Sequence, residues 1–470
     1  MVSNGDSSEA LSNVDSAWLR MEDPTNLMTI TALMSFEEKL DFSRLKREIE
    51  DRLLPFDRFR QKVVQPRLPF AKARWQEDEH FALAAHLRRL ALPHPADQGT
   101  LQEVVSELMS TPLDYSKPLW QLHYVENYGA GCAIIGRIHH CIGDGLGLMR
   151  VLFSLVDESP NADGGPAASR PAEPPRSGAP GGGAGRSRGW VPDGGLDAML
   201  SPSRILELAS KGASAATELG KLLTLSADPK TVFKGKLGVV KRAVWSDPIP
   251  LAKVKACSRA MGATINDLLL TAVSGALRRY MLDRGDVPAG LSFRAVVPVN
   301  LRLPDEPMEL GNRFGLVFLS LPVGTEGGVE RLRALKQEMD RIKGSPQAIV
   351  AFGVLNALGM ASAEIESVGV SIFARKATAV MTNVPGPQKQ LYLAGKAIKE
   401  IMFWVPQSGR LGLGVSIFSY AGNVRLGIAV DSGLVPNPGM IVTHFHDELD
   451  SLTRYAGDTK REEEKTEGRA

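Results

Sequence analysis

The sequence predicts an α/β protein built from two domains, and three features of the chain lead to this prediction. The first is its length, because 470 residues exceed the roughly 100–200 residues of a typical domain. The second is the mixture of helix-like and strand-like segments in both halves, which is typical of sheets flanked by helices. The third is a break in composition, where six prolines and eight glycines fall among the 30 residues from Pro160 to Gly189.

This break divides the chain into four parts. Residues 1–158 form a first domain and residues 199–456 a second one. Residues 159–198 between them are rich in glycine and proline and have no periodic apolar pattern, so they are predicted to be a flexible linker. Residues 457–470 are dominated by charge and are predicted to be a disordered tail.

Apolar spacing predicts the elements of the first half. In chain order they are a strand at 28–36, helices at 42–54 and 101–109, hairpin strands at 120–127 and 132–139, and a helix at 145–156. In the second half, a sustained helical pattern covers residues 265–281, and Thr264 with Asp267 forms a capping box at its start. Four further strands are predicted there, at 293–299, 316–321, 411–420 and 423–430.

Composition and charge exclude several classes of protein. Lysine and arginine number 55 against 53 acidic residues, whereas a dedicated nucleic-acid-binding protein normally carries a strong basic excess. The three cysteines, Cys132, Cys141 and Cys257, are too few and too scattered for a disulfide framework or a paired metal motif. The N-terminus lacks the features of a secretion signal. A cytoplasmic protein, with peripheral contact to a membrane or lipid droplet as an option, is therefore expected.

The most apolar stretch of the chain, residues 348–363, is interrupted by Gly353, Asn356 and Gly359. It falls short of the roughly 18 continuous apolar residues expected of a spanning helix. Two interpretations stay open: a helix of the core, or an apolar patch that lies on a lipid surface.

One motif carries chemistry. Residues 139–145 read His-His-Cys-Ile-Gly-Asp-Gly, between a predicted strand and a predicted helix. Consecutive residues at the end of a strand point to opposite faces, so only one of His139 and His140 can enter a given cavity. Histidine suits general-base catalysis because its ordinary pKa of about 6.5 lies close to working pH. A metal site at His139, His140 and Asp144 is disfavoured, because adjacent histidines do not readily bind one ion.

The spacing His-His-x-x-x-Asp-Gly resembles that of the chloramphenicol-acetyltransferase-like superfamily. Further runs narrow the resemblance to the wax ester synthase/diacylglycerol acyltransferase family over about residues 11–455. These runs are Asp15 with Met21-Glu22-Asp23-Pro24-Thr25-Asn26, Pro118-Leu119-Trp120, Asn266-Asp267, Val297-Pro298-Val299-Asn300, Gly311-Asn312-Arg313-Phe314-Gly315 and Thr382-Asn383-Val384-Pro385-Gly386-Pro387.

The resemblance implies two chloramphenicol-acetyltransferase-like sandwich domains, each a mixed sheet flanked by helices, with an active-site tunnel between them. It also implies that His140 is the general base and His139 its support. Asp144, followed by Gly145, would hold the loop by pairing with an arginine, for which Arg60 is the candidate.

The implied reaction transfers a long-chain acyl group from acyl-CoA, which is a substrate, to a fatty alcohol or diacylglycerol. No acyl-enzyme, cofactor or metal is expected. The alternatives are a condensation-type natural-product acyltransferase with a carrier-protein donor, and a non-catalytic lipid-surface protein of the same fold.

The same runs supply candidate substrate-binding residues, namely Pro118, Trp120, Asn266, Asp267, Asn300, Asn312 and Asn383. For several of these residues, a purely structural role is an alternative to substrate binding. Asn266 could donate a hydrogen bond to the substrate or only begin the helix, Asp267 could only cap it, and Pro118 with Trp120 could only pack at the start of a strand.

Overall fold

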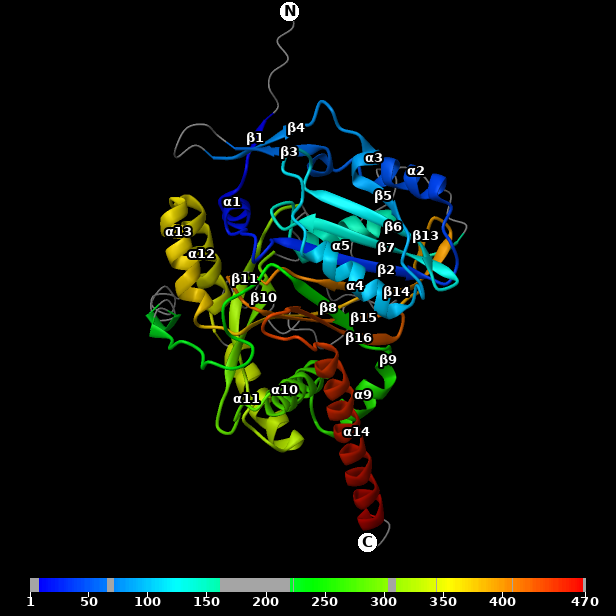
Figure 1. Cartoon of the computed structure of the whole chain (residues 1–470). Coiled ribbons are helices and arrows are strands. Elements are labelled where there is room, and N and C mark those ends of the chain that lie inside the picture. The colour runs from blue at the N-terminus through cyan, green and yellow to red at the C-terminus, as the bar shows by residue number, and fades with distance from the viewer. Residues whose placement is uncertain are drawn as a thin grey trace, which may run out of the picture.

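The computed structural model describes residues 8–65, 72–160, 220–222, 224–302, 310–343, 345–407 and 409–467. Two large mixed or antiparallel sheets dominate it, and Figure 1 shows helices packed around them. The predicted linker at 159–198 lies outside the described residues, apart from its first two.

The first sheet has six strands, with β7 and β2 at its centre. In spatial order they are β13 (Tyr392–Leu393), β14 (Lys396–Trp404), β2 (Thr29–Phe36), β7 (Gly131–His139), β6 (Trp120–Tyr128) and β5 (Leu87–Leu90). β6 and β7 form the predicted hairpin, and β2 pairs antiparallel with β7 along its whole length. A small sheet at the N-terminal edge consists of β1 (Glu9–Ala10), β4 (Arg74–Glu77) and β3 (Gln61–Val64).

The second sheet has seven strands and belongs to the second half of the chain. Its main path runs β11 (Phe314–Leu321), β10 (Phe293–Asn300), β12 (Ala379–Pro385), β15 (Leu413–Tyr420), β16 (Asn423–Asp431) and β8 (Lys241–Trp245), and β9 (Ile249–Pro250) also pairs with β16. β10, β12 and β15 run parallel to one another, whereas the other pairs are antiparallel. Both sheets contain parallel and antiparallel pairs and are therefore mixed, as predicted.

The helices are α1 (Asn13–Arg20), α2 (Phe42–Arg52), α3 (Leu83–His86), α4 (Gln98–Met109), α5 (Gly145–Leu155), α9 (Leu251–Ala260), α10 (Ile265–Asp283), α11 (Gly328–Lys343), α12 (Gln347–Met360), α13 (Ala363–Ala374) and α14 (Gly439–Glu467), with a short 3-10 helix at Asp57–Phe59. α10 is the central one: nearly all its residues are buried, and the predicted capping box of Thr264 and Asp267 is present.

Two cores share the second sheet. Alternate residues of β15, such as Val415 and Ile417, face α9, α10, α11 and α14, as period-two geometry requires. Phe418 and Tyr420 of the same strand belong to the core of the first sheet. In Figure 1 the first sheet lies above the second, α9, α10 and α14 lie below, and α12 with α13 forms a hairpin at the left. The site lies where the two halves meet.

The structure corrects two boundaries expected from the sequence. β13 and β14 lie within residues 199–456 but join the first sheet, where β14 pairs with β2, so the two sheets do not follow the predicted division of the chain. α14 continues to Glu467 through most of the predicted disordered tail at 457–470. Local composition indicates neither the exchange of a strand nor the continuation of a long helix.

No single helix among the described residues has the length and apolar composition to cross a membrane. α9 and α10 meet these criteria only as a pair, and they are bent by 96° relative to each other. Nearly all of α10 is buried within the second core.

Candidate active site

The two histidines of the motif lie where β7 ends beside the start of β2. His139 pairs with Thr29 across the sheet, and the backbone N–H of His140 donates a 2.7 Å hydrogen bond to the carbonyl of Met28. The carbonyl of His140 accepts a 2.7 Å bond from Nδ2 of Asn312, in the second half of the chain. Both halves therefore hold the backbone of the motif in place.

The imidazole of His140 is enclosed by aromatic rings. It stacks on the indole of Trp18, with ring centroids 4.2 Å apart and planes 15° from parallel, and the ring of Phe314 lies 5.7 Å away. Only 6% of His140 is exposed. Burial lowers its pKa to about 4, against the opposing effect of the negative charge of Asp144, because a low-dielectric site disfavours the charged form. His140 is therefore neutral near pH 7 and able to accept a proton.

Asp144 is the N-cap of α5 and joins the two halves of the chain. Its Oδ1 accepts from the backbone N–H of Gly147 at 3.0 Å. Its Oδ2 accepts from Arg302 at 2.5 Å and from the backbone N–H of Arg313 at 2.9 Å. The carbonyl of Gly311 in turn accepts bonds from the N–H of Asp144 and from Arg302. These contacts fasten the loop that follows His140 onto the segment after β10.

Arg302 takes the place that the sequence predicted for Arg60, and that prediction is wrong. Arg60 forms ion pairs with Glu77 and Asp57 on the outer part of the first half. The ion-pair partners of Arg60 are therefore acidic residues of the same half of the chain. Arg302 is distant from Asp144 in the chain but follows directly on β10, which brings it to the loop.

His139 lies on the other side of the motif, in polar surroundings. Its Nε2 is 3.2 Å from a carboxylate oxygen of Glu22, and its Nδ1 accepts from the backbone N–H of Cys141 at 3.1 Å. The hydroxyl of Tyr115 donates to Glu22 at 2.9 Å, and the same carboxylate accepts from the N–H of Met28 at 2.7 Å. His139 therefore links the motif to the N-terminal segment.

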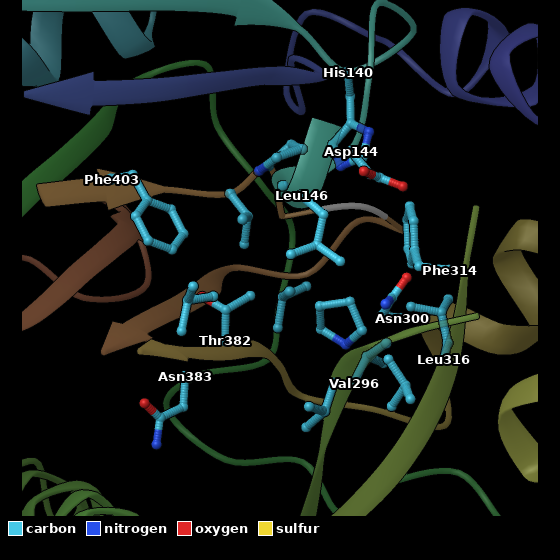
Figure 2. A pocket seen from close by; sticks show the side chains of 18 of the residues that line it. His140, Asp144, Leu146, Val296, Asn300, Phe314, Leu316, Thr382, Asn383 and Phe403 are labelled. Carbon is cyan, nitrogen blue, oxygen red and sulfur yellow. The ribbon is translucent and has the colours of Figure 1, made fainter. Parts of the chain in front are cut away.

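A pocket opens in front of His140, between the first sheet and the second. Figure 2 shows His140 and Asp144 together at one end, Phe403 at one side, and Phe314, Asn300 and Leu316 at the other. The walls come from α5, β10, β11, β12 and β14, through the apolar side chains of Leu146, Val296, Val297, Val299, Phe314, Leu316, Val380, Val384, Phe403 and Val405. A pocket with such walls suits an alkyl chain more than a polar substrate.

The polar content of the pocket is small. Besides His140 and Asp144, polar side chains reach it from Asn300, Arg302, Thr382 and Asn383. No group of three or more His, Cys, Asp or Glu side chains in the described part of the chain could hold a metal ion. The pocket therefore offers one base, a few amide and hydroxyl groups, and an apolar lining.

The pocket includes some predicted substrate-binding residues and leaves out others. Asn300 and Asn383 line it. Asn266 lies one step behind, because its Oδ1 accepts a 2.5 Å bond from Nδ2 of Asn383. Asp267 caps α10, where it accepts from the backbone N–H of Thr264, and does not reach the lining.

Three other predicted binding residues have structural contacts instead. The indole of Trp120 donates a hydrogen bond to the carbonyl of Phe59, and the carbonyl of Pro118 accepts a 2.9 Å bond from the backbone N–H of Trp120. Asn312 is outside the lining because its amide is used to bind Asp15 and the carbonyl of His140. Asp267, Pro118, Trp120 and Asn312 therefore lie outside the lining of this pocket, and their role in substrate binding stays a prediction.

Sequence reasoning missed three residues of the site. Trp18 was not singled out, Glu22 was quoted without a role, and Arg302 follows the Val-Pro-Val-Asn run by two positions. Proximity to that run is the one local signal that could have suggested Arg302. Nothing in the sequence places Trp18 against His140, because the contact joins α1 to a loop more than 100 residues further along.

Comparison with known proteins adds the family. The wax ester synthase/diacylglycerol acyltransferase catalytic domain matches residues 11–269, and the C-terminal domain of the same family matches residues 310–453. A probable diacylglycerol O-acyltransferase of Mycobacterium tuberculosis, tgs1, is 27% identical over 450 residues, covering 94% of this chain and 95% of the relative. A second from that organism, tgs2, is 28% identical over 457 residues, covering 94% and 98%.

Solved structures agree in fold. A wax ester synthase/diacylglycerol acyltransferase from Marinobacter aquaeolei VT8 superposes with a TM-score of 0.69 at 22% identity, covering 95% of this chain and 99% of that one. The first condensation domain of the calcium-dependent antibiotic synthetase gives a TM-score of 0.60 at 14% identity, covering 97% of each chain. The chain therefore shares its fold with both of these structures.

The chain belongs to the wax ester synthase/diacylglycerol acyltransferase family. Its two family domains together span most of the sequence, which confirms the predicted family and enzyme class. The solved neighbours confirm the predicted fold class.

Proposed function

We propose that this protein transfers a long-chain acyl group from acyl-CoA to a lipid alcohol, either a fatty alcohol or diacylglycerol, with His140 as general base. The observation that carries this proposal is a buried, neutral imidazole at one end of an apolar pocket between the two sheets. A base of this kind has the protonation state needed at neutral pH. The apolar lining matches an acyl chain in chemistry.

The proposed step joins the two substrates directly. His140 removes the proton of the alcohol as its oxygen attacks the thioester carbonyl, because an alcohol is too weak an acid to ionise beforehand. The tetrahedral intermediate then expels the CoA sulfur, the C–S bond breaks, and the proton passes from the imidazolium to the thiolate. The products are an ester and free CoA, and the enzyme returns to its starting state with no cofactor. General-base assistance of this type typically contributes about 10²–10⁴-fold.

Asp144 has a separate task in this proposal. It is bound to Arg302, Arg313 and the start of α5, so its carboxylate holds the loop after His140 rather than taking part in proton transfer. The position of His140 relative to the pocket then depends on an ion pair that crosses between the halves. Orientation of this kind is a large part of catalysis when two substrates meet in one site.

The test is an acyl-CoA assay with purified protein and two acceptors offered in parallel, hexadecanol and diacylglycerol. Release of free thiol together with a chromatographically resolved wax ester or triacylglycerol supports the proposal and identifies the preferred acceptor. If no thiol is released with either alcohol, the protein is a non-catalytic lipid-surface protein. Transfer only from a carrier-protein thioester, with acyl-CoA inactive, indicates the condensation-type alternative.

We further propose that the protein reaches its lipid substrates by peripheral contact with a lipid surface through the outer face of the α12–α13 hairpin. The support is the exposure of Met360, Ile365 and Val368, each more than 60% exposed. Exposed apolar groups that lie together can dip into the headgroup boundary. The inner face of α12 has a different role, since Leu355 is buried against Trp18 and Phe314.

Liposome sedimentation tests this second proposal. Ile365→Ser with Val368→Ser should weaken binding to liposomes while the melting temperature stays the same, because both side chains already face solvent. Leu355→Ser is the matched control, and it should lower the melting temperature, since large-to-small changes in a core cost about 2–5 kcal/mol. Unchanged sedimentation of the double variant would remove the hairpin as the lipid-binding surface.

A further inference from the structure

The side chain of Trp18 stacks on the imidazole of His140, the proposed base. Its indole lies nearly parallel to the imidazole of His140 at a centroid distance of 4.2 Å. Both side chains are almost fully buried, and Trp18 is 3% exposed. The two rings therefore meet face to face in a space from which water is largely excluded.

The buried Nε1 of Trp18 has no hydrogen-bond partner among the described residues. A buried indole normally finds an acceptor for this N–H, so the position accepts a cost that a phenylalanine or leucine would avoid. The contact that distinguishes the position is the aromatic face turned toward His140.

The helix that carries Trp18 is fastened on two sides. Asp15 on the same helix accepts from Nδ2 of Asn312 at 2.8 Å, and Asn312 also binds the carbonyl of His140. On the other side, Nδ2 of Asn13 donates to Asn356 on α12 at 3.1 Å. The backbones of α1 and α12 approach so closely at Gly359 that an added Cβ would lie 1.9 Å from the carbonyl oxygen of Asn13. The indole is thus attached to the same framework as the base.

A stacked indole changes what the base can do. An imidazole without a firm contact can rotate about its side-chain bonds. If this rotation displaces the reacting nitrogen by about 1 Å, the rate of the reaction falls strongly. When His140 takes up the alcohol proton it becomes a cation in an apolar pocket, and burial penalises that charge. Among aromatic side chains, tryptophan has the electron-rich face that attracts a cation most strongly.

We propose that Trp18 is a positioning residue for catalysis: its indole fixes the orientation of the His140 ring and stabilises the imidazolium formed during proton transfer. This inference rests on the acyltransferase activity proposed above. It adds a role for the first helix, which supplies no base, acid or nucleophile of its own to the pocket.

The test compares Trp18→Leu and Trp18→Phe with the wild-type enzyme. Loss of the aromatic face in Trp18→Leu should lower kcat by roughly 2- to 30-fold, the rate equivalent of a cation–π contact. KM for acyl-CoA should change little, because the contact acts on the base. Trp18→Phe keeps a face and should recover most of kcat. Trp18→Met replaces Trp18→Leu if the latter does not fold.

Trp245 provides the matched control. It is also a buried tryptophan, its Nε1 likewise has no partner among the described residues, and it lies on β8 against Trp404 rather than at the pocket. Trp245→Leu should lower the melting temperature and leave kcat within about twofold. If Trp18→Leu and Trp245→Leu lose stability alike and keep kcat alike, the proposal is overturned.

A spectroscopic measurement separates this proposal from the proposed function. With ¹³C-labelled histidine, the ring C–H resonance of His140, assigned by its absence in His140→Gln, should show the ring-current shift of a stacked indole and lose it in Trp18→Leu. This readout does not need turnover. A resonance unmoved by Trp18→Leu overturns the stacking role even in an active enzyme. If Trp18→Leu loses the shift but the wild-type protein acts on no alcohol, the stacking of Trp18 on His140 is supported and only the proposed function is rejected.

Discussion

His139 and His140 are neighbours in the chain, yet the structure gives them opposite surroundings. His140 faces an apolar pocket, stacked on Trp18, and burial lowers its pKa to about 4. His139 faces the polar side, bonded to Glu22 and to the backbone of Cys141. The same side chain becomes a candidate base on one side and a support on the other. The surroundings, which strand geometry determines, assign the role.

Glu22 is the charged group on the polar side of the motif, next to His139. Burial raises the pKa of its carboxyl, but the hydrogen bond and charge of His139, with the bonds from Met28 and Tyr115, outweigh burial and hold the pKa below its usual value. Glu22 is therefore an anion with three donors around it. On the apolar side, the carboxylate of Asp144 is bound to Arg302 and to the backbone N–H of Arg313.

The largest expected effect follows from removing the base. His140→Ala should lower kcat by at least about 10²–10⁴-fold, because general-base assistance is lost. The fold should survive, since the backbone bonds of His140 to Met28 and Asn312 do not use the side chain. The measurement is product formation at saturating substrates, with circular dichroism to verify folding. Near-wild-type turnover in a folded His140→Ala protein would reject the assignment.

Breaking the ion pair that joins the halves should have the next largest effect. Asp144→Asn removes the negative charge that pairs with Arg302, and loss of one charge of a buried pair typically costs about 3–5 kcal/mol. Activity and the melting temperature should therefore fall together. Arg60→Met is the control and should change neither by much, because the pairs of Arg60 with Glu77 and Asp57 are partly exposed and weak. A shifted pH–rate profile with unchanged stability would mean that Asp144 tunes His140 directly.

Acid should destabilise the folded protein through its buried histidines. The pKa of His140 and that of His123 are both lowered to about 4, chiefly by burial, whereas the unfolded chain titrates near 6.5. Between these two pKa values the unfolded state binds more protons than the folded state does. The free energy of unfolding therefore falls as pH is lowered from about 6.5 to 4. Each group contributes up to about 3 kcal/mol, at 1.36 kcal/mol per pKa unit.

Urea unfolding at several pH values measures this effect, and His123→Gln tests it without touching the pocket. His123 lies on β6, with its Nε2 buried and without a partner among the described residues. The variant should show a shallower loss of stability with falling pH than the wild type. The same slope in both proteins would show that His123 is not a neutral buried group.

The smallest expected effect lies on the polar side of the motif. Glu22→Gln removes the charge that three donors share, so His139 and the Met28 backbone should shift and carry His140 with them. We expect kcat to fall about tenfold, equivalent to one charged hydrogen bond of about 1.4 kcal/mol, with KM unchanged. Tyr115→Phe removes a single donor and should cost less. Equal activity in all three proteins would make the polar network dispensable.

Much of the fold could be predicted because its signals are local. The hairpin of β6 and β7, the helix after the motif and the capping box of α10 depend on apolar period, turns and caps within a few residues. The position of the His-His motif at the end of a strand was predicted in the same way. The insertion of β14 beside β2 could not be, because its pairing partner lies over 360 residues away in the chain.

The candidate site divides along the same line. His140, Asp144, Asn300 and Asn383 were identified from short motifs, and the structure brings all four to one pocket. The arginine that binds Asp144 was misassigned, because a charge pair in sequence has many possible partners and only folding selects one. Trp120 was placed among the binding residues for its motif, but its indole donates to Phe59 inside the first core.

By itself, the sequence determined the family, the histidine motif, the two-domain α/β class and some of the helices and strands. Each of these depends on residue types at fixed spacing, which the chain carries without reference to its fold. The tertiary structure decided which histidine faces the pocket, that Arg302 holds Asp144, and that Trp18 covers the base. These depend on distances between residues remote in sequence and on desolvation, and both arise only when the two sheets pack together.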